Sequence, residues 1–316
     1  MCHPVAIWLL CHTQRKGRGD AFMKKRGLTG RRQQAFYGIL YILPSFVIIL
    51  LFSIVPIILA VYFSFTKYDM YSPAEFIGLQ NYAGVFKSAT FYSALWNTLK
   101  YVIVTVPIQT LLALLIAVFI ADKMRGLYGA LLKSTIFIPV IVSNIAAAAV
   151  WKVMLKTKGG IINNFLGLFG ISEVNWLGAK ALAFLCICLV TIWKNVGYYM
   201  VIYYAGVMGI PKEQQEAALM DGASPAQRFW HVTVPNLRPI TYMIVTLGII
   251  SSFQIFDIVF QLTGGGPGTS TITLAYMVYT YAFSNQKLGY ASAIAVILLL
   301  FVLVIHWLQD KVFKER

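Results

Sequence analysis

The chain has 316 residues, of which 59% are hydrophobic and only 12% are charged, and its mean hydropathy is +0.73. About a quarter of the residues in a soluble domain are charged, so this chain cannot cover a water-facing surface. A formal net charge of +15 can accompany nucleic-acid binding, but basic loops are expected in a membrane protein, and eight of the 26 basic residues precede Ala35. We therefore predict an all-α polytopic membrane protein that is surrounded by lipid and binds no nucleic acid.

Residues 1–35 form a basic tail with an unusual beginning. The apolar piece Pro4–Leu10 is too short to cross a bilayer and lacks the basic flank that precedes the core of a signal peptide. We expect Met23 to be the biological start and residues 1–22 to be an upstream extension that is not native.

Six apolar runs follow, each long enough to cross a hydrocarbon core of about 30 Å. The expected spans lie at about 36–65, 97–121, 131–155, 181–204, 240–262 and 289–308. We expect a short surface helix in the loop after the third span and a flexible loop from Thr263 to about Leu288. The six-helix domain then covers 36–309, and 310–316 form a C-terminal tail.

The basic residues predict the orientation of these spans. An even number of spans places both termini on one side, and the segments on that side hold 17 basic residues, whereas the other three loops hold eight. The positive-inside rule then places both termini and the polar interval 205–238 in the cytoplasm. We expect a multi-pass protein of the cytoplasmic membrane.

The polar interval 205–238 contains the start and stop signals of two short helices joined by a turn. Pro211 suits the first turn of a helix, and Gly222 suits the left-handed position just past its end. Ser224 and Gln227 have the spacing of a capping box, which predicts that a second helix begins there and runs toward Pro235. A helical hairpin between two spans indicates a docking surface.

Two charged residues lie inside apolar runs, Lys194 in the fourth span and Asp257 in the fifth. A charge inside the bilayer costs at least about 2.5 kcal/mol on insertion scales, so each is a functional candidate by default. Both could line a polar path with Asn195, Ser251, Ser252 and Gln254. Alternatively, each side chain reaches an interface or pairs with its neighbours.

Residue spacing groups some of these candidates. Gln254 and Asp257 are three apart, and Trp193 and Gly197 are four apart, so each pair is expected to share a helical face. Aromatic rings beside polar groups suit a polar organic solute such as a sugar, although Trp and Tyr also collect at membrane interfaces.

The sequence contains no pattern typical of nucleotide binding, metal binding or catalysis. Its only glycine-rich loop, Gly264–Gly268, lacks the Gly-Lys-Ser/Thr of a phosphate-binding loop. The four histidines have no partner at metal spacing, and Cys186 and Cys188 point in different directions on a helix. We predict that the chain is not an enzyme and binds no cofactor or metal.

One motif within the hairpin resembles that of a known family. Glu216 begins a Glu-Ala-Ala triplet, Gly222 follows three residues after it, and nine further residues lead to Val-Thr-Val-Pro, which ends at Pro235. This pattern resembles the EAA loop of binding-protein-dependent ABC importer permeases, which ends Ile-x-Leu-Pro, so both aliphatic positions are Val here. Other segments from about Arg31 to Arg316 are similar to the carbohydrate-importer branch: YILPSFVIILLFSIVPI, FIGLQNY, LWNTLKY, WKNVGYYMVIYYAGVMGIP, SFQIFDIVFQLTGGGP and GYASAIAVIL.

The resemblance implies the type I ABC importer permease fold, with the EAA loop as a cytoplasmic coupling helix seated on an ABC ATPase dimer. ATP and Mg would be bound by that ATPase. A second homologous permease would complete a heterodimer in a bacterial inner membrane, and an extracytoplasmic solute-binding protein would deliver a sugar or sugar-like solute, such as an oligosaccharide or glycerol phosphate. The implied ATPase-coupling residues are Glu213, Glu216, Ala217, Ala218, Asp221, Gly222 and Pro235. The implied substrate-pathway residues are Trp193, Asn195, Gly197, Ser252 and Gln254, to which the charges of Lys194 and Asp257 are added.

The main alternative is a secondary transporter driven by an ion gradient. Such a protein would carry internal repeats, and the two halves of the sequence show no convincing repeat. A membrane-embedded enzyme would need a catalytic cluster at an interface, which the sequence also lacks. Which solute is carried does not follow from the sequence.

Overall fold

The computed structural model describes residues 36–124 and 126–314, so the expected start at Met23 and the whole basic tail 1–35 lie outside the described residues. Most described residues are helical, and the strands among them are one antiparallel pair, β1 (Thr66–Lys67) with β2 (Glu75–Phe76); loops make up the rest. The chain divides into two compact units between Leu59 and Ala60, and each is described by itself.

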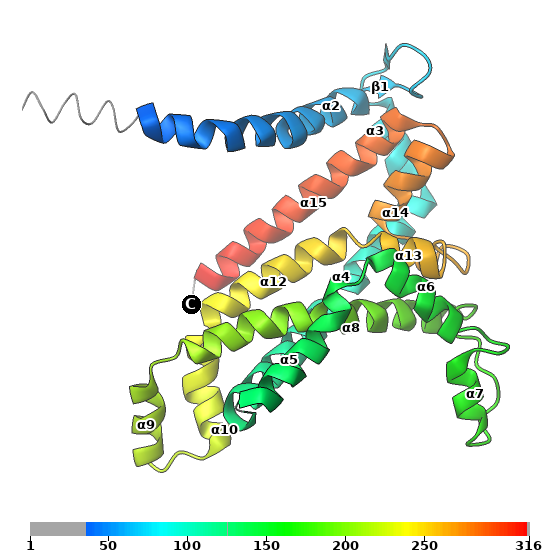
Figure 1. The fold of residues 1–316 in the computed structure, drawn as a ribbon. Coiled ribbons are helices and arrows are strands. Elements are labelled where there is room, and N and C mark those ends of the chain that lie inside the picture. The colour runs from blue at the N-terminus through cyan, green and yellow to red at the C-terminus, as the bar shows by residue number, and fades with distance from the viewer. Residues whose placement is uncertain (1–35, 125, 315–316) are drawn as a thin grey trace, which may run out of the picture. The chain divides into compact units, whose positions relative to one another are not determined.

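The helices follow one another as Figure 1 shows. After helical residues 36–49 they are η1 (Leu50–Ile54), α2 (Val55–Ser64), α3 (Gln80–Lys87), α4 (Ala89–Lys123), α5 (Gly126–Ile141), α6 (Asn144–Met154), α7 (Ile161–Gly167), α8 (Lys180–Met208), α9 (Lys212–Met220), α10 (Pro225–Arg228), η2 (Phe229–Thr233), α11 (Val234–Asn236), α12 (Arg238–Phe253), α13 (Asp257–Leu262), α14 (Leu274–Tyr279), η3 (Thr280–Ser284) and α15 (Leu288–Lys314).

The first expected span is an apolar helix, Phe36–Ser64. The π-helical turn η1 ends two residues before Pro56. A proline has no N–H and its ring clashes with the carbonyl four residues earlier, so the wider π turn accommodates it without breaking the helix.

Three further expected spans are recovered as long single helices. α4 has 35 residues, α8 has 29 and α15 has 27. At about 1.5 Å per residue, each exceeds the thickness of a hydrocarbon core. With the first helix they make four helices that are long and apolar enough to cross a membrane.

The third expected span is not one continuous helix. α5 and α6 meet at an angle of 96° across Val142 and Ser143. Pro139 near the end of α5 removes a helical hydrogen bond. The bent pair would make a fifth span, by length and composition.

The fifth expected span is also interrupted, because α12 ends at Phe253 and α13 begins at Asp257. The Ile255 carbonyl in the gap accepts a hydrogen bond of 2.8 Å from the Thr273 hydroxyl, which satisfies backbone that the helix no longer pairs. The prediction that Gln254 and Asp257 share a helical face is therefore wrong, because they belong to different helices.

The loop after the fifth span is more ordered than predicted. Residues from Leu274 to Ser284 are helical as α14 and η3, whereas we expected a flexible loop. The Thr273 side chain caps α14 by accepting from the Tyr276 N–H, and Leu274 and Met277 are buried. The expected short helix after the third span is confirmed as α7.

The core of the second unit forms where α4 packs along α8 and α12. Small residues of α4, Ala113 and Ala117, lie against Tyr199 and Tyr203 of α8 in one buried cluster. Small side chains allow membrane helices to approach closely. At its C-terminal end α15 joins α12, where the Gln309 amide donates to the Thr246 hydroxyl at 2.8 Å.

This packing separates two ends of the second unit. α9 and α10 lie near the start of α12, whereas β1 and α3 lie near the start of α15 (Figure 1). Because α15 is about 40 Å long at 1.5 Å per residue, these ends are more than a hydrocarbon thickness apart.

Candidate functional site

The first arm of the predicted hairpin is α9. Pro211 stands at its N-cap, one residue before the position that we expected. At its C-terminus, the Gly222 N–H bonds to the Leu219 carbonyl at 3.0 Å and the Ala223 N–H to the Ala218 carbonyl at 2.9 Å. This is a Schellman motif, and Gly222 adopts the predicted left-handed conformation with φ of 75°.

The second arm begins at the predicted capping box. The Ser224 Oγ accepts from the Gln227 N–H at 3.3 Å, and the Gln227 Oε1 accepts from the Ser224 N–H at 2.8 Å. The two arms are then joined, because the Asn236 amide donates to the Gln214 Oε1 at 2.8 Å. The ends of both arms are thus specified by residues at those ends, and the hydrogen bond between Asn236 and Gln214 holds the two arms together.

The candidate coupling residues lie on an open surface. Exposed are Glu213, Glu216, Ala217, Asp221, Gly222 and Pro235, and Ala218 is half-buried. Next to them, Leu219 is 53% exposed and Met220 is 88% exposed. Sequence reasoning missed these two apolar side chains, although their position at the end of α9, just before the Gly222 turn, could have indicated them. Exposed apolar side chains that are rimmed by polar ones are typical of a contact with another protein.

A polar cavity of about 300 Å³ lies where the third and fifth spans are interrupted. Its lining residues are Asn144, Thr191, Asn195, Ser251, Gln254, Ile255, Phe256, Asp257 and Ile258. The Asn144 amide donates to the Asp257 Oδ2 at 3.0 Å, which joins the start of α6 to the start of α13. Of the residues predicted to line a polar path, the structure brings Asn195, Ser251, Gln254 and Asp257 together in this cavity.

Sequence reasoning did not single out two of the polar residues that line the cavity, Asn144 and Thr191. Thr191 is four residues before Asn195, so the helical period of α8 could have placed both on one face. Asn144 is brought in by the break between α5 and α6, which no local motif specifies.

The other pathway candidates lie outside the cavity lining. Ser252 is buried and its hydroxyl is 3.0 Å from that of Thr105, which links α12 to α4. Trp193 lines an apolar groove of about 560 Å³ and packs edge-to-face on Trp151, with ring centroids 5.6 Å apart. Gly197 is buried against α5, where an added Cβ would lie 2.3 Å from the Ile136 carbonyl oxygen.

Lys194 neither reaches an interface nor lines the cavity. Its side chain is only 6% exposed, and its Nζ donates to the carbonyls of Pro139, Val140 and Val142 at 3.2, 3.3 and 2.6 Å. These carbonyls belong to the last turn of α5 and to the break that follows it. The ammonium therefore caps the broken helix.

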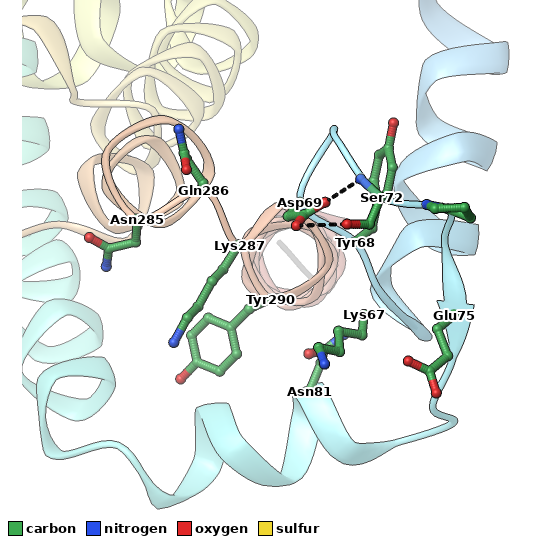
Figure 2. Close-up of a pocket in the computed structure, with 11 residues that line it drawn as sticks. Lys67, Tyr68, Asp69, Ser72, Glu75, Asn81, Asn285, Gln286, Lys287 and Tyr290 are labelled. Atoms are coloured by element: carbon green, nitrogen blue, oxygen red, sulfur yellow. Dashed lines mark hydrogen bonds between the residues drawn. The ribbon is translucent and has the colours of Figure 1, made fainter.

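A larger pocket of about 760 Å³, drawn in Figure 2, lies beside β1 and the start of α15, at the opposite end of the unit from the hairpin (Figure 1). It is lined by residues from β1 to β2, by Asn81 of α3, and by the turn before α15 together with its first residues. Gly289 allows these segments to meet, because a Cβ there would lie 2.0 Å from the Thr66 carbonyl oxygen. Two non-glycine residues with positive φ, Met70 at 71° and Gln286 at 53°, lie in the segments that form the pocket.

Charged side chains of both signs face this pocket, as Figure 2 shows for Lys67, Asp69, Glu75 and Lys287. The Asp69 Oδ1 accepts from the backbone N–H groups of Ser72 at 2.8 Å and Tyr71 at 3.0 Å. These bonds, that from Ser72 first, lower the pKa of the Asp69 carboxyl, so it is ionised at neutral pH.

The sequence matches a family model described as "Binding-protein-dependent transport system inner membrane component" over residues 76–315. The probable ABC transporter permease protein YurN of Bacillus subtilis is 33% identical over 278 residues, which cover 87% of this chain and 95% of that protein. The trehalose/maltose transport system permease protein MalF of Thermococcus litoralis is 33% identical over 276 residues, covering 87% and 92%.

A solved structure has the same fold. It is a chain of a bacterial ABC transporter involved in the import of the acidic polysaccharide alginate, with a TM-score of 0.78 and 21% identity over 90% of this chain and 96% of that one. The EAA pattern, the helical architecture and the length of the matches agree. The chain belongs to the family of binding-protein-dependent transport system inner membrane components, the permeases of ABC importers.

Proposed function

We propose that this permease carries a sugar or sugar-like solute inward and takes its energy from a separate ATPase subunit docked on the hairpin. The proposal is supported by one observation: the same chain has an exposed hairpin with acidic side chains and a polar cavity where two helical spans are interrupted. The hairpin and the cavity share one helix, because α8 lines the cavity through Asn195 and ends just before α9. The chain itself would bind neither ATP nor Mg.

The solute class is inferred from the groups that line the cavity. Amide and hydroxyl side chains of Asn144, Thr191, Asn195, Ser251 and Gln254 offer donors and acceptors, as hydroxylated solutes require. Asp257 is the only charged residue in the described lining and its carboxylate would repel an anion. We therefore favour a neutral sugar over glycerol phosphate. Relatives are named for trehalose and maltose and for arabinooligosaccharides, which accords with this choice.

The proposed assembly has three further partners. A second homologous permease would complete the translocation path, because one chain supplies a cavity of only about 300 Å³. An ATPase dimer would dock on the cytoplasmic side, where the basic residues predict both termini. A solute-binding protein would approach the opposite end, where the charged pocket beside Lys287 offers a contact. A related structure was solved with its periplasmic protein bound.

Replacing Asp257 by Asn is expected to lower uptake at limiting solute by about tenfold, because a hydrogen bond to a charged group contributes about 1.5–3 kcal/mol. The solute is first identified by a thermal-shift screen of the binding protein against neutral and anionic sugars. Uptake is then measured in proteoliposomes that contain the complete importer.

The matched control is Glu173→Gln, which neutralises an exposed carboxylate in the loop before α8. It should transport at the wild-type rate. Equal uptake by Asp257→Asn, or wild-type uptake of an anionic sugar only, would contradict the proposed solute class.

A further inference from the structure

A break inside a membrane span leaves backbone carbonyls without helical partners. The last four carbonyls of any helix lack them, and each unsatisfied group in hydrocarbon costs several kcal/mol. Between α5 and α6 the chain turns by 96°. The carbonyls at this break therefore need a donor from elsewhere in the fold.

Lys194 supplies that donor from α8. An ammonium group has three N–H donors, and here they face the carbonyls of Pro139, Val140 and Val142 at 3.2, 3.3 and 2.6 Å. A positive charge at a helix C-terminus is also favoured by the helix dipole. These three hydrogen bonds thus satisfy three backbone carbonyls at the break, and they offset the free-energy cost of burying the ammonium.

The neighbours of Lys194 on α8 contact both limbs of the break. Gly197, three residues later, packs directly on the backbone of α5 at Ile136. Trp193, one residue earlier, packs on Trp151 of α6. One turn of α8 therefore contacts α5, the break and α6.

This turn lies on the route between the hairpin and the cavity. α8 ends at Met208 and α9 of the hairpin starts at Lys212. On the other side of the break, Asn144 donates to Asp257 in the polar cavity. A displacement of α8 would move the carbonyls that Lys194 holds, and with them Asn144.

We propose that Lys194 is a positioning residue that transmits movement of the hairpin through α8 to the break of the third span, and so couples ATP hydrolysis to the shape of the polar cavity. The proposal rests on the function proposed above. Lys194 is not among the residues that line the polar cavity. It acts through the backbone on which Asn144 is carried.

The experiment measures solute uptake and binding-protein-stimulated ATP hydrolysis together, in proteoliposomes that contain the complete importer. Lys194→Met keeps an unbranched side chain and removes the three donors. We expect the solute moved per ATP to fall at least about fivefold while hydrolysis stays within about twofold of wild type, because the hairpin remains intact. Lys194→Arg, which restores a buried cation with donors, should recover part of the ratio.

The matched control is Lys180→Met at the exposed start of the same helix, which should leave the ratio unchanged. If Lys194→Met does not assemble, Lys194→Gln, which retains an N–H₂ donor, is measured instead and should show an intermediate ratio. Proportional loss of uptake and hydrolysis, or an unchanged ratio, overturns the inference. Failure of the wild-type importer to hydrolyse ATP or transport would instead overturn the proposed function.

Discussion

Reversing the charge of Glu216 is expected to reduce the ATPase that co-purifies with the permease to less than about a tenth and to abolish uptake. We expect Glu216 to pair with a basic residue of the ATPase, and Lys at this position would make a like-charge contact, which costs several kcal/mol at an interface. Glu216 is exposed on α9, and Lys has nearly the same helix propensity, so Glu216→Lys should leave the hairpin folded. The loss would therefore report the contact and not the fold. Co-purification on a tagged permease, followed by uptake in cells, measures both effects.

The matched control is Asp122→Lys, which reverses an exposed acidic residue near the end of α4, on the side that is predicted to be cytoplasmic. It should retain the ATPase and transport normally. If Glu216→Lys retains a full complement of ATPase and wild-type uptake, the docking surface lies elsewhere.

Replacing Gly197 by Ala is expected to destabilise the permease by about 1–3 kcal/mol, the usual cost of overpacking, and to lower its thermal midpoint. The added Cβ would lie 2.3 Å from the Ile136 carbonyl oxygen and 3.1 Å from the Phe137 Cα. Both atoms belong to the backbone of α5, so α5 and α8 must separate. That separation would also lengthen the bonds from Lys194 to the break, and uptake should fall with stability.

Intrinsic helix propensity acts in the opposite direction, since Ala is favoured over Gly by about 1 kcal/mol in a helix interior. Gly167→Ala at the end of α7 is the matched control, because an added Cβ there would meet nothing within 4 Å, and it should be neutral. Tryptophan fluorescence during thermal unfolding of the purified importer compares the two. A Gly197→Ala protein as stable and as active as Gly167→Ala would show that α5 and α8 are not in close contact.

The hairpin could be predicted from the sequence because its signals are local. Gly222 terminates α9 with a left-handed residue, and Ser224 and Gln227 cap the next helix, whatever surrounds them. The long apolar runs were predictable for the same reason, since length and composition alone determine whether a helix can cross the bilayer.

The interrupted spans could not be predicted in this way. Pro107 lies inside the continuous helix α4, whereas Pro139 lies just before a break, and nothing in their local sequence separates them. The difference is tertiary, because only Pro139 has the Lys194 ammonium beside its carbonyl. The polar cavity depends on the same breaks, so Asn144 was missed while Asn195, on a regular helix, was found.

The claim that energy enters through the hairpin is tested most directly by cross-linking. Met220, which is 88% exposed, is replaced by Cys in a background without the four native cysteines, and a short cross-linker that joins this thiol to lysine amines is added to the complete importer. We expect a covalent permease–ATPase product whose yield changes between the nucleotide-free and ATP-bound states, and no such product from Leu168→Cys in the loop after α7. An ATPase product from Leu168→Cys alone, or none from Met220→Cys, would contradict it.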